Sequence, residues 1–410
     1  MSEESQPVAV PMRIGAEWVA GRATFESRDP YRGTVVARVP ESDRTDVDAA
    51  YVAAAAGRDA MAAMPGHERA RRLRIAARLL EERRPLIAET MAREIGKAIR
   101  DADAEIRRSV ETVELSAEEA VRIEGEHVPL DASEMGAGKT CMMLRFPIGI
   151  VVGITPFNAP VNLACHKIAP ALAAGNAIIL KAPPQAPLTV HRLVEAFVDA
   201  GFPDGAIGSL HGTAAGPLLV ADPRADFITF TGSSRAGAAI KAASGLRRVA
   251  LELGGTGSTI GHADAEIGPA AALCARNPTR LAGQSCISVQ AVYVHRAIAA
   301  AFTEAVVAAV KSFRTGDPLA PDTDVGTLID EAAAKRVESW VGEAVAAGAT
   351  LLARGTRPGA AFAPTVLTDV RPTMKVVCDE VFGPVVSIVP YDDVSEAFAA
   401  INRSPYGLQA

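Results

Sequence analysis

Ile150-Val151-Val152-Gly153-Ile154 is the stretch that decides the fold, because it is an uninterrupted apolar run of strand length. Further short apolar runs follow along the chain, with segments of helical pattern between them: 177–180, 206–210, 227–230 and 249–251. Strands that alternate with helices predict a parallel sheet covered by helices on both faces. The sequence therefore predicts an α/β unit built around these runs.

The regions on either side of this unit extend the α/β pattern. Residues 45–123 have the spacing of several amphipathic helices, and the helical period then lapses over 128–144. After Gly255 the alternation resumes with a helix, a strand and a second helix: 267–276, 291–294 and 298–310. Because 410 residues exceed the usual size of one hydrophobic core, we predict two domains, with the second starting near residue 253.

The composition argues against a nucleic-acid or membrane partner. The 42 basic and 48 acidic side chains give a net charge of −6, spread without long blocks of one sign. Residues 1–5 are acidic and polar residues interrupt the longer apolar stretches, so neither a signal peptide nor a membrane span is predicted. The 5 cysteines are scattered, which indicates neither a disulfide framework nor a zinc site. We expect a small-molecule partner, no metal, and a reducing cytoplasm.

A cysteine and a glutamate are candidates for covalent chemistry. Cys286 follows Gly283 and Gln284 in a predicted loop, where small neighbours give a carbonyl compound access to sulfur. Glu252 ends an apolar strand, where a charged side chain is costly unless it is paired or functional. A thiol nucleophile and a carboxylate base suggest chemistry at a carbonyl group. The alternatives are a small buried hydrophobe for Cys286 and a solvent-facing carboxylate for Glu252.

Two further segments lie where open α/β sheets bind ligands. Asn158 follows the strand 150–154, and its amide can donate to a developing oxyanion, although an asparagine after a proline is commonly a turn residue. Residues 230–237 lead from a strand into a helix, whose free backbone N–H groups suit a pyrophosphate. A thiol that holds an aldehyde would then lie beside a hydride acceptor.

Together these segments resemble the motifs of the NAD(P)+-dependent aldehyde dehydrogenase superfamily, in the order in which that family has them. The matching segments are Pro156-Phe157-Asn158, 230–237, Glu252-Leu253-Gly254-Gly255, Gly283-Gln284-Ser285-Cys286 and Glu380-Val381-Phe382-Gly383-Pro384. The resemblance implies an α/β fold with a Rossmann-like parallel-sheet cofactor domain and a second α/β catalytic domain. It assigns residues 1–122 and 141–252 to NAD(P) binding, 123–140 to an oligomerisation arm, and 253–410 to the catalytic domain.

The resemblance also implies a role for each matching residue. Cys286 would be the nucleophile, Glu252 the base, and Asn158 the oxyanion donor together with the backbone N–H of Cys286, while Lys167 belongs to the active site through the helix after Asn158. The residues implied for cofactor binding are Ile154, Thr155, Pro156, Lys181, Gly212, Gly216, Phe230, Gly232, Ser233, Leu253, Gly254, Glu380 and Phe382. NAD or NADP is the implied cofactor, an aldehyde the substrate, and a homodimer or homotetramer the assembly.

The sequence departs from the family pattern in several places. Pro184 stands where NAD-preferring relatives often carry a glutamate, which keeps NADP open as a cofactor. Leu281 replaces the usual asparagine before Ala-Gly-Gln, and Pro278 could bend the segment that leads to Cys286. The sequence stops at Ala410, whereas family members continue for several dozen residues, so we expect the usual C-terminal segment to be absent.

The implied reaction is the oxidation of an aldehyde to a carboxylic acid. The thiolate of Cys286 would attack the aldehyde, Asn158 would stabilise the oxyanion, hydride would pass to NAD(P)+, and Glu252 would activate water to hydrolyse the thioester. The alternatives are a CoA-acylating semialdehyde dehydrogenase, in which CoA resolves the thioester, and a noncatalytic nucleotide-binding paralogue. No cluster of arginines indicates a particular substrate among the residues expected to line the tunnel: Ala159, His166, Ser285 and Ile287.

Overall fold

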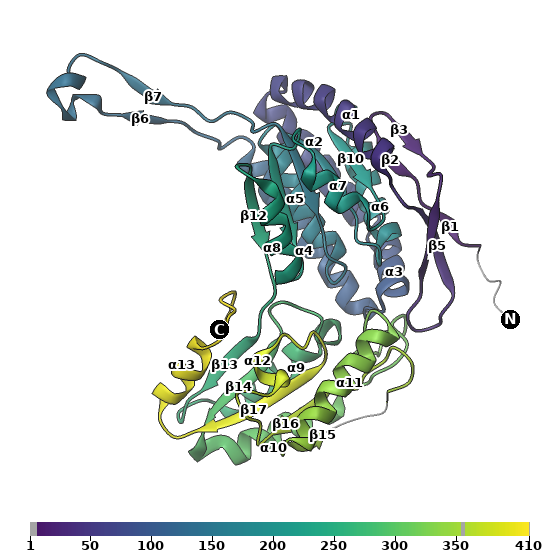
Figure 1. Cartoon of the computed structure of the whole chain (residues 1–410), viewed down its shortest axis with the longest axis vertical. Helices are drawn as coiled ribbons and strands as arrows, with labels where there is room; N and C mark the ends of the chain where they lie inside the picture. Colours follow the sequence, from purple (N-terminus) through teal and green to yellow (C-terminus); the bar gives the residue numbers. More distant parts are fainter. Residues whose placement is uncertain (1–5, 354–356, 410) are drawn as a thin grey trace.

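The structure is a computed structural model in which residues 6–353 and 357–409 are described. Two α/β units lie one above the other in Figure 1, and a long hairpin projects from the upper unit. The upper unit contains a seven-stranded sheet and the lower unit a five-stranded sheet, so the predicted α/β fold class is confirmed.

The sheet of the upper unit has the strand order β12-β11-β8-β9-β10-β2-β3. Its strands are β2 (Met12–Ile14), β3 (Glu17–Val19), β8 (Ile150–Ile154), β9 (Ala177–Lys181), β10 (Ile207–Leu210), β11 (Phe227–Thr231) and β12 (Arg248–Glu252). β8 to β12 are parallel, and β2 and β3 join antiparallel at one edge. The parallel strands are the apolar runs predicted from the sequence, each within about one residue of its predicted bounds.

The strand order reverses at β8. β9 and β10 are added on one side of β8, whereas β11 and β12 are added on the other. Open α/β sheets bind their ligands outside the carboxyl ends of the strands at such a reversal. Ile154, at the end of β8, pairs with Lys181 of β9 and with Phe230 of β11, and the next pair is Thr231 with Glu252. These predicted site residues therefore form one row along the sheet.

Helices cover both faces of this sheet, as Figure 1 shows. They are α1 (Arg44–Ala63), α2 (Gly66–Glu82), α3 (Arg84–Ile95), α4 (Ile99–Glu119), α5 (Pro160–Ala173), α6 (Pro187–Asp199), α7 (Ala215–Ala221) and α8 (Ser234–Ser244). Neighbouring residues of a strand point to opposite faces, so Val151 packs with α2 to α6 while Val152 packs with α1 and α7. Because both faces are covered, the central strand β8 is apolar throughout.

The lower unit is built around a sheet of order β13-β14-β17-β16-β15. Its strands are β13 (Gly257–Gly261), β14 (Val289–His295), β15 (Thr350–Ala353), β16 (Thr365–Thr368) and β17 (Val385–Tyr391). Its helices are α9 (Ile267–Arg276), α10 (Arg296–Ser312), α11 (Glu331–Ala346), α12 (Lys375–Cys378) and α13 (Val394–Asn402). The predicted helix 267–276 is confirmed. The strand predicted at 291–294 begins two residues earlier and ends one residue later. The helix predicted at 298–310 is two residues longer at each end.

Two small sheets lie outside these units. One is formed by β1 (Val8–Ala9), β4 (Thr24–Arg28) and β5 (Val35–Pro40), which the sequence analysis did not predict. The other is the hairpin of β6 (Glu126–Val128) and β7 (Cys141–Met143), with the short 3-10 turns η1 (Leu130–Ala132) and η2 (Glu134–Gly136) at its tip. Figure 1 shows this hairpin extending away from both units.

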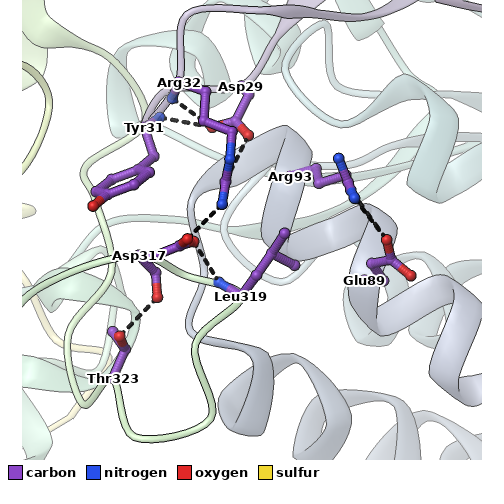
Figure 2. A network of polar contacts seen from close by, with 8 residues as sticks. All are labelled: Asp29, Tyr31, Arg32, Glu89, Arg93, Asp317, Leu319 and Thr323. Carbon is purple, nitrogen blue, oxygen red and sulfur yellow. Dashed lines mark hydrogen bonds and ion pairs between the residues drawn. The ribbon is translucent and has the colours of Figure 1, made fainter. Parts of the chain in front are cut away.

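The two units touch along the edge that Figure 2 shows in part. Arg32, in the turn between β4 and β5, donates to Asp29 of the same turn and to Asp317 of the lower unit. Nearby, the backbone N–H of Thr327 donates to the carbonyl oxygen of Gly96 at 2.9 Å. These contacts fix the turn between β4 and β5 and the segment before α4 against the lower unit.

Candidate active site

Glycine residues allow three segments to meet at the end of β12. Glu252 is the last residue of β12, and Gly254 and Gly255 follow it. A Cβ atom on Gly254 would lie 2.4 Å from Oε2 of Glu380, and one on Gly255 would lie 2.5 Å from the carbonyl oxygen of Cys286. The turn after Glu252, the Glu380 side chain and the Cys286 backbone are therefore brought together, as the motifs predicted.

The loop that carries Cys286 is held in an unusual backbone conformation. The 3-10 segment η3 (Asn277–Gly283) follows α9, and Leu281, Ala282 and Gly283 have φ values of 54°, 51° and 73°. This left-handed region costs an ordinary residue about 1 kcal/mol or more. Pro278 lies at the start of η3 and interrupts no α-helix. The resemblance implies an asparagine at position 281, and the backbone there has a positive φ. Asparagine adopts positive φ more readily than leucine does.

The side chain of Gln284 ties this loop to its surroundings. Its Nε2 donates to the carbonyl oxygens of Leu281 at 3.1 Å and Thr327 at 3.4 Å, and its Oε1 accepts from the N–H of Ile329 at 2.8 Å. The sequence analysis named Gln284 as part of the motif that precedes Cys286, and it did not predict that the Gln284 side chain anchors the loop. A buried amide among backbone groups is visible only once the loop and residues 327–329 are placed together.

Asn158 reaches the same loop from the other unit. Its Nδ2 donates to the carbonyl oxygen of Gln284 at 2.8 Å. The side chain is buried, and its Oδ1 has no hydrogen-bond partner among the residues described. Because the amide nitrogen carries two protons and Gln284 accepts one, the other is available to an oxygen bound beside Cys286.

The surroundings of Cys286 favour the protonated thiol. Burial raises its pKa, and the carboxylates of Glu380 and Glu252 raise it further, while hydrogen bonds from the backbone N–H groups of Cys286 and Ile287 act in the opposite direction. Cys286 is half-buried and free, so it is accessible but needs a proton acceptor to react near neutral pH.

Lys167 lies beneath this site rather than in contact with the thiol. Its Nζ donates to Oγ1 of Thr231 at 2.9 Å and to Oγ1 of Thr229 at 3.2 Å, both on β11. Burial lowers its pKa to about 8, and the negative charge of Glu252 acts to raise it. Lys167 is thus within electrostatic range of Glu252, and its catalytic role stays a prediction.

The start of α8 has the features that suit a dinucleotide. Ser233 caps this helix, its Oγ accepting from the N–H of Ala236 at 3.3 Å, and the first turn offers its other N–H groups to an anion. A Cβ on Gly232 would lie 2.5 Å from the ring of Phe230, and one on Gly237 would lie 2.4 Å from Leu253. These residues fit a nicotinamide cofactor, because glycine lets its phosphates approach the backbone.

A second group of predicted cofactor residues lies around the ends of β8, β9 and β10. Burial lowers the pKa of Lys181 to about 8, and the carboxylate of Glu41 acts to raise it. Both the N–H and the hydroxyl of Thr155 approach the carbonyl oxygen of Lys181 at 3.3 Å. Gly212 has a φ of 85°, and a Cβ there would lie 2.5 Å from the Glu41 carboxylate. Gly216 lies in α7, with no atom within 4 Å of an added Cβ.

Glu380 and Phe382 approach the site from the lower unit. Oε1 of Glu380 accepts from the backbone N–H of Gly255 at 3.1 Å, and burial raises the pKa of its carboxyl. The ring of Phe382 packs edge-on against Phe157, with 6.0 Å between ring centres. Glu380 is therefore a half-buried carboxylate within reach of both Gly254 and Cys286.

A cation near the site was missed by the sequence analysis. The pKa of His166, one of the expected tunnel residues, is lowered by burial and by the positive charges of Arg108 and Lys167, and Glu252 acts to raise it. Arg108 on α4 and Glu252 therefore both lie near the His166 ring. The guanidinium of Arg108 has no ion pair or hydrogen bond with the described residues. Only the packing of α4 against α5 reveals its position, because 58 residues separate Arg108 from His166.

The described residues contain neither a membrane-spanning helix nor a cluster of metal-binding side chains. None of the described helices is long and apolar enough to cross a membrane. Within the same part of the chain, no group of three or more histidine, cysteine, aspartate and glutamate side chains could hold a metal ion.

Known proteins are similar to this chain in both sequence and fold. A model described as the aldehyde dehydrogenase family matches residues 18–410. The sequence is 39% identical over 413 residues to 3-sulfolactaldehyde dehydrogenase of Priestia aryabhattai, covering 100% of this chain and 86% of that relative.

Solved structures agree closely with the fold. Aldehyde dehydrogenase 21 from Physcomitrella patens, in complex with its reaction product succinate, has a TM-score of 0.94 and 38% identity and covers 98% of this chain and 84% of its own. NADP-dependent glyceraldehyde-3-phosphate dehydrogenase from Bacillus halodurans, complexed with NADP, has a TM-score of 0.95 and 34% identity, with coverages of 98% and 85%.

The shared fold and the row of strand ends define a two-unit α/β dehydrogenase. The chain belongs to the aldehyde dehydrogenase family, and it is an enzyme of the NAD(P)+-dependent class.

Proposed function

We propose that this enzyme oxidises an aldehyde that carries an anionic group to the corresponding carboxylic acid, through a thioester on Cys286. The observation that carries the proposal is the hydrogen bond of 2.8 Å between Nδ2 of Asn158 and the carbonyl oxygen of Gln284. This bond directs an amide donor at the loop that bears the thiol. Such a donor is useful where a carbonyl oxygen becomes negative during attack by sulfur.

In the proposed reaction, the thiol of Cys286 passes its proton to solvent water, and the sulfur adds to the aldehyde carbon. Asn158 and the backbone N–H of Cys286 then stabilise the oxyanion. When bound by Lys181, Ser233 and Glu380, NAD+ or NADP+ supplies the acceptor for the hydride that leaves this carbon. Glu252 takes a proton from water, the resulting hydroxide attacks the thioester, and the carboxylic acid leaves as the thiol is restored.

Arg108 supports the proposal that the substrate is an anion. The names of the three relatives concern molecules with a sulfonate, a second carboxylate or a phosphate. Arg108 lies beside His166, near Glu252, and has no ion pair among the described residues. A free guanidinium in that place suits an anionic group at the far end of an aldehyde.

The test is reduced-cofactor formation by the purified protein. The substrates would be 3-sulfolactaldehyde, succinic semialdehyde and propanal, each with NAD+ and with NADP+, and with and without CoA. We expect turnover that is lost in Cys286→Ala, an acid product that CoA does not change, and a preference for the anionic aldehydes. A CoA thioester as product would instead indicate the acylating alternative, and cofactor binding without turnover would indicate a noncatalytic protein.

Arg107 provides a matched control for Arg108. Arg107 is the next residue of α4, but it pairs with Asp103 on the same helix. We expect Arg108→Met to raise KM for the anionic aldehydes about tenfold or more and to leave propanal unchanged. Arg107→Met should change neither. Equal effects of the two substitutions would remove Arg108 from substrate recognition.

We also propose that the hairpin of β6 and β7 joins subunits in a homodimer or homotetramer. Apolar side chains are exposed along and beside it: Met135 at 85%, Met142 at 71%, Leu144 at 63% and Phe146 at 80%. Exposed apolar surface of this kind favours association. Light scattering should show a smaller particle for Phe146→Asp if the proposal holds, and no change in mass would contradict it.

The state of the cysteines supports a reducing cytoplasm as the proposed location. The five cysteines Cys141, Cys165, Cys274, Cys286 and Cys378 are all free. A catalytic thiol also requires reducing conditions to stay active. Cell fractionation with detection of the protein would test the location.

A further inference from the structure

The helix that follows Asn158 begins without a cap of its own. α5 starts at Pro160, two residues after Asn158, and no side chain at its start caps it. Glu105 of α4 supplies the acceptor instead, because its Oε1 accepts from the N–H groups of Val161 at 2.9 Å and Asn162 at 3.0 Å. A carboxylate also suits the positive end of the helix dipole. The start of α5 is thus fixed by a residue from another helix.

The second oxygen of Glu105 is held by Lys97. Nζ of Lys97 donates to Oε2 of Glu105, and the two side chains are only 2% and 7% exposed. A buried ion pair of this kind resists separation, because either partner alone would be an uncompensated charge. Glu105 therefore cannot turn away from α5 without leaving the Lys97 ammonium buried and unpaired.

Lys97 also lies beside the active-site loop. One small cavity of about 10 Å³ is lined by Lys97, Asn158 and Gln284. A cavity of this size holds about one water molecule at most, so the three residues lie close together. The preceding residue, Gly96, accepts a hydrogen bond from Thr327, whose own carbonyl accepts from the side chain of Gln284. The segment that bears Lys97 is therefore fixed against the two groups that place the amide of Asn158.

We propose that Glu105, held by its ion pair with Lys97, caps the start of α5 and thereby positions Asn158 as an oxyanion donor. Lys97 and Glu105 are positioning residues, since neither touches Cys286. They fix the start of α5, which follows Asn158. The Asn158 side chain is then held in the orientation in which it donates to the carbonyl oxygen of Gln284. The inference rests on the proposed function, because the pair affects the reaction only through Asn158. Loss of the Glu105 oxygen that caps α5 should lower kcat with little change in KM, as for an interaction made in the transition state.

A second buried glutamate provides a control with the same local chemistry. Glu94 of α3 caps α6, which also starts with a proline and has no side-chain cap of its own. It accepts from the N–H groups of Leu188 at 3.0 Å and Thr189 at 2.7 Å. No predicted catalytic residue lies on α6. Removal of this cap should affect stability in the same way without reaching Asn158.

Four variants separate the cap from the charge pair. Lys97→Met with Glu105→Leu removes both charges and the cap, whereas Lys97→Met with Glu105→Gln keeps an oxygen for the start of α5. Glu105→Asp keeps the charge but is shorter by one carbon, and it serves if the leucine variant does not fold. Glu94→Leu is the control. Each would be made with Asn158 and with Asn158→Ala, and kcat, KM and the thermal midpoint would be measured with the best aldehyde.

We expect the leucine double variant and Glu105→Asp to lower kcat about tenfold or more when Asn158 is present. In the Asn158→Ala background they should lower it less than about twofold, because the donor they position is gone. The glutamine double variant should keep most of the activity. Glu94→Leu should lower the thermal midpoint and change kcat by the same small factor in both backgrounds.

Two results would overturn the inference in different ways. Equal losses of kcat in both backgrounds would show that the pair acts on stability or packing in general, while leaving the role of Asn158 intact. An unchanged kcat in Asn158→Ala itself would remove the proposed oxyanion donor, and the positioning role would fail with it.

Discussion

The side-chain amide of Asn158 donates to the backbone carbonyl of Gln284 across 126 positions of the sequence. The bond joins the end of β8 in the upper unit to the Cys286 loop of the lower unit. A hydrogen bond therefore joins the two units beside the proposed nucleophile Cys286. A shift of the loop would displace the donor and the thiol together.

Replacement of Asn158 by alanine should lower kcat about a hundredfold or more, with KM within about threefold, because the donor acts on charge that develops during the reaction. Steady-state kinetics would check this. Asn176→Ala is the control, since the Asn176 side chain accepts from the N–H of Gly149 at the opposite end of the sheet and should affect stability alone. A large rise in KM for Asn158→Ala, with kcat unchanged, would contradict the oxyanion role.

Neutralisation of either nearby carboxylate should speed the alkylation of Cys286. Burial, Glu380 and Glu252 all raise the pKa of this thiol, so Glu380→Gln and Glu252→Gln should lower it and increase the thiolate fraction at pH 7.5. Iodoacetamide labelling followed by mass spectrometry should show rates about two- to tenfold higher.

Cys141 in the hairpin is the internal control for this labelling, because it lies on β7 and away from both carboxylates. Its rate should not change. Slower labelling of Cys286 in Glu252→Gln would show that Glu252 takes the proton from the thiol, in addition to any role in activating water.

Alanine substitutions should distinguish a glycine that packs against a side chain from a glycine that leaves room for the cofactor. Gly254→Ala places a Cβ 2.4 Å from Glu380 and should lower kcat by displacing that side chain. Gly216→Ala meets no atom within 4 Å and alanine favours a helix, so it should not lower the thermal midpoint, and it should raise KM for the cofactor if the dinucleotide passes there. Gly342→Ala, with similar open space in α11, is the control: it should raise the thermal midpoint, because alanine favours a helix, and leave the cofactor KM unchanged. An unchanged cofactor KM in Gly216→Ala would remove Gly216 from the cofactor site.

Glu94 should make the protein less stable as pH rises from about 4.5 to 7. Burial raises its pKa to about 7 from an ordinary value of 4.5, so in this range the folded state binds more protons than the unfolded state. Stability is then greatest below pH 4.5 for this group, falls as the pH rises to 7, and stays level above it.

Urea unfolding at pH 5 and pH 7.5 would measure this dependence. The wild type should lose on the order of 2 kcal/mol more between the two pH values than Glu94→Gln, which cannot ionise. The variant should also be less stable at pH 5, because its amide would face donors from Thr189. Parallel pH dependences in the two proteins would show that Glu94 does not titrate in this range.

The sequence predicted the central strands because burial on both faces makes each an apolar run, as in residues 150–154. It also predicted Glu252 and Cys286 as site residues, because their motifs are local. It could not predict the contacts that place them, because Gln284 is held by Leu281, Thr327 and Ile329, and only one of these is near it in sequence. Short strands such as β2 were missed because three residues carry too little periodicity.

The charged residues inside the helical layer were the hardest to find. Glu105 and Arg108 are one turn apart on α4, yet one is buried against Lys97 and the other lies at the surface near His166. In the sequence both belong to an ordinary amphipathic helix with a charged face. Their difference depends on how α4 packs against α5, which the local pattern does not contain.

The two glutamate caps come earlier in the chain than the helices that they cap. Glu94 and Glu105 lie on α3 and α4, which leave the ribosome before α5 and α6, the helices they cap. Protein chains generally begin to fold from the N-terminal side during synthesis. Each later helix therefore meets its acceptor already made. In a circular permutant that opens between α4 and α5, this order would be reversed, and α5 and α6 would emerge before the carboxylates that accept from their first N–H groups.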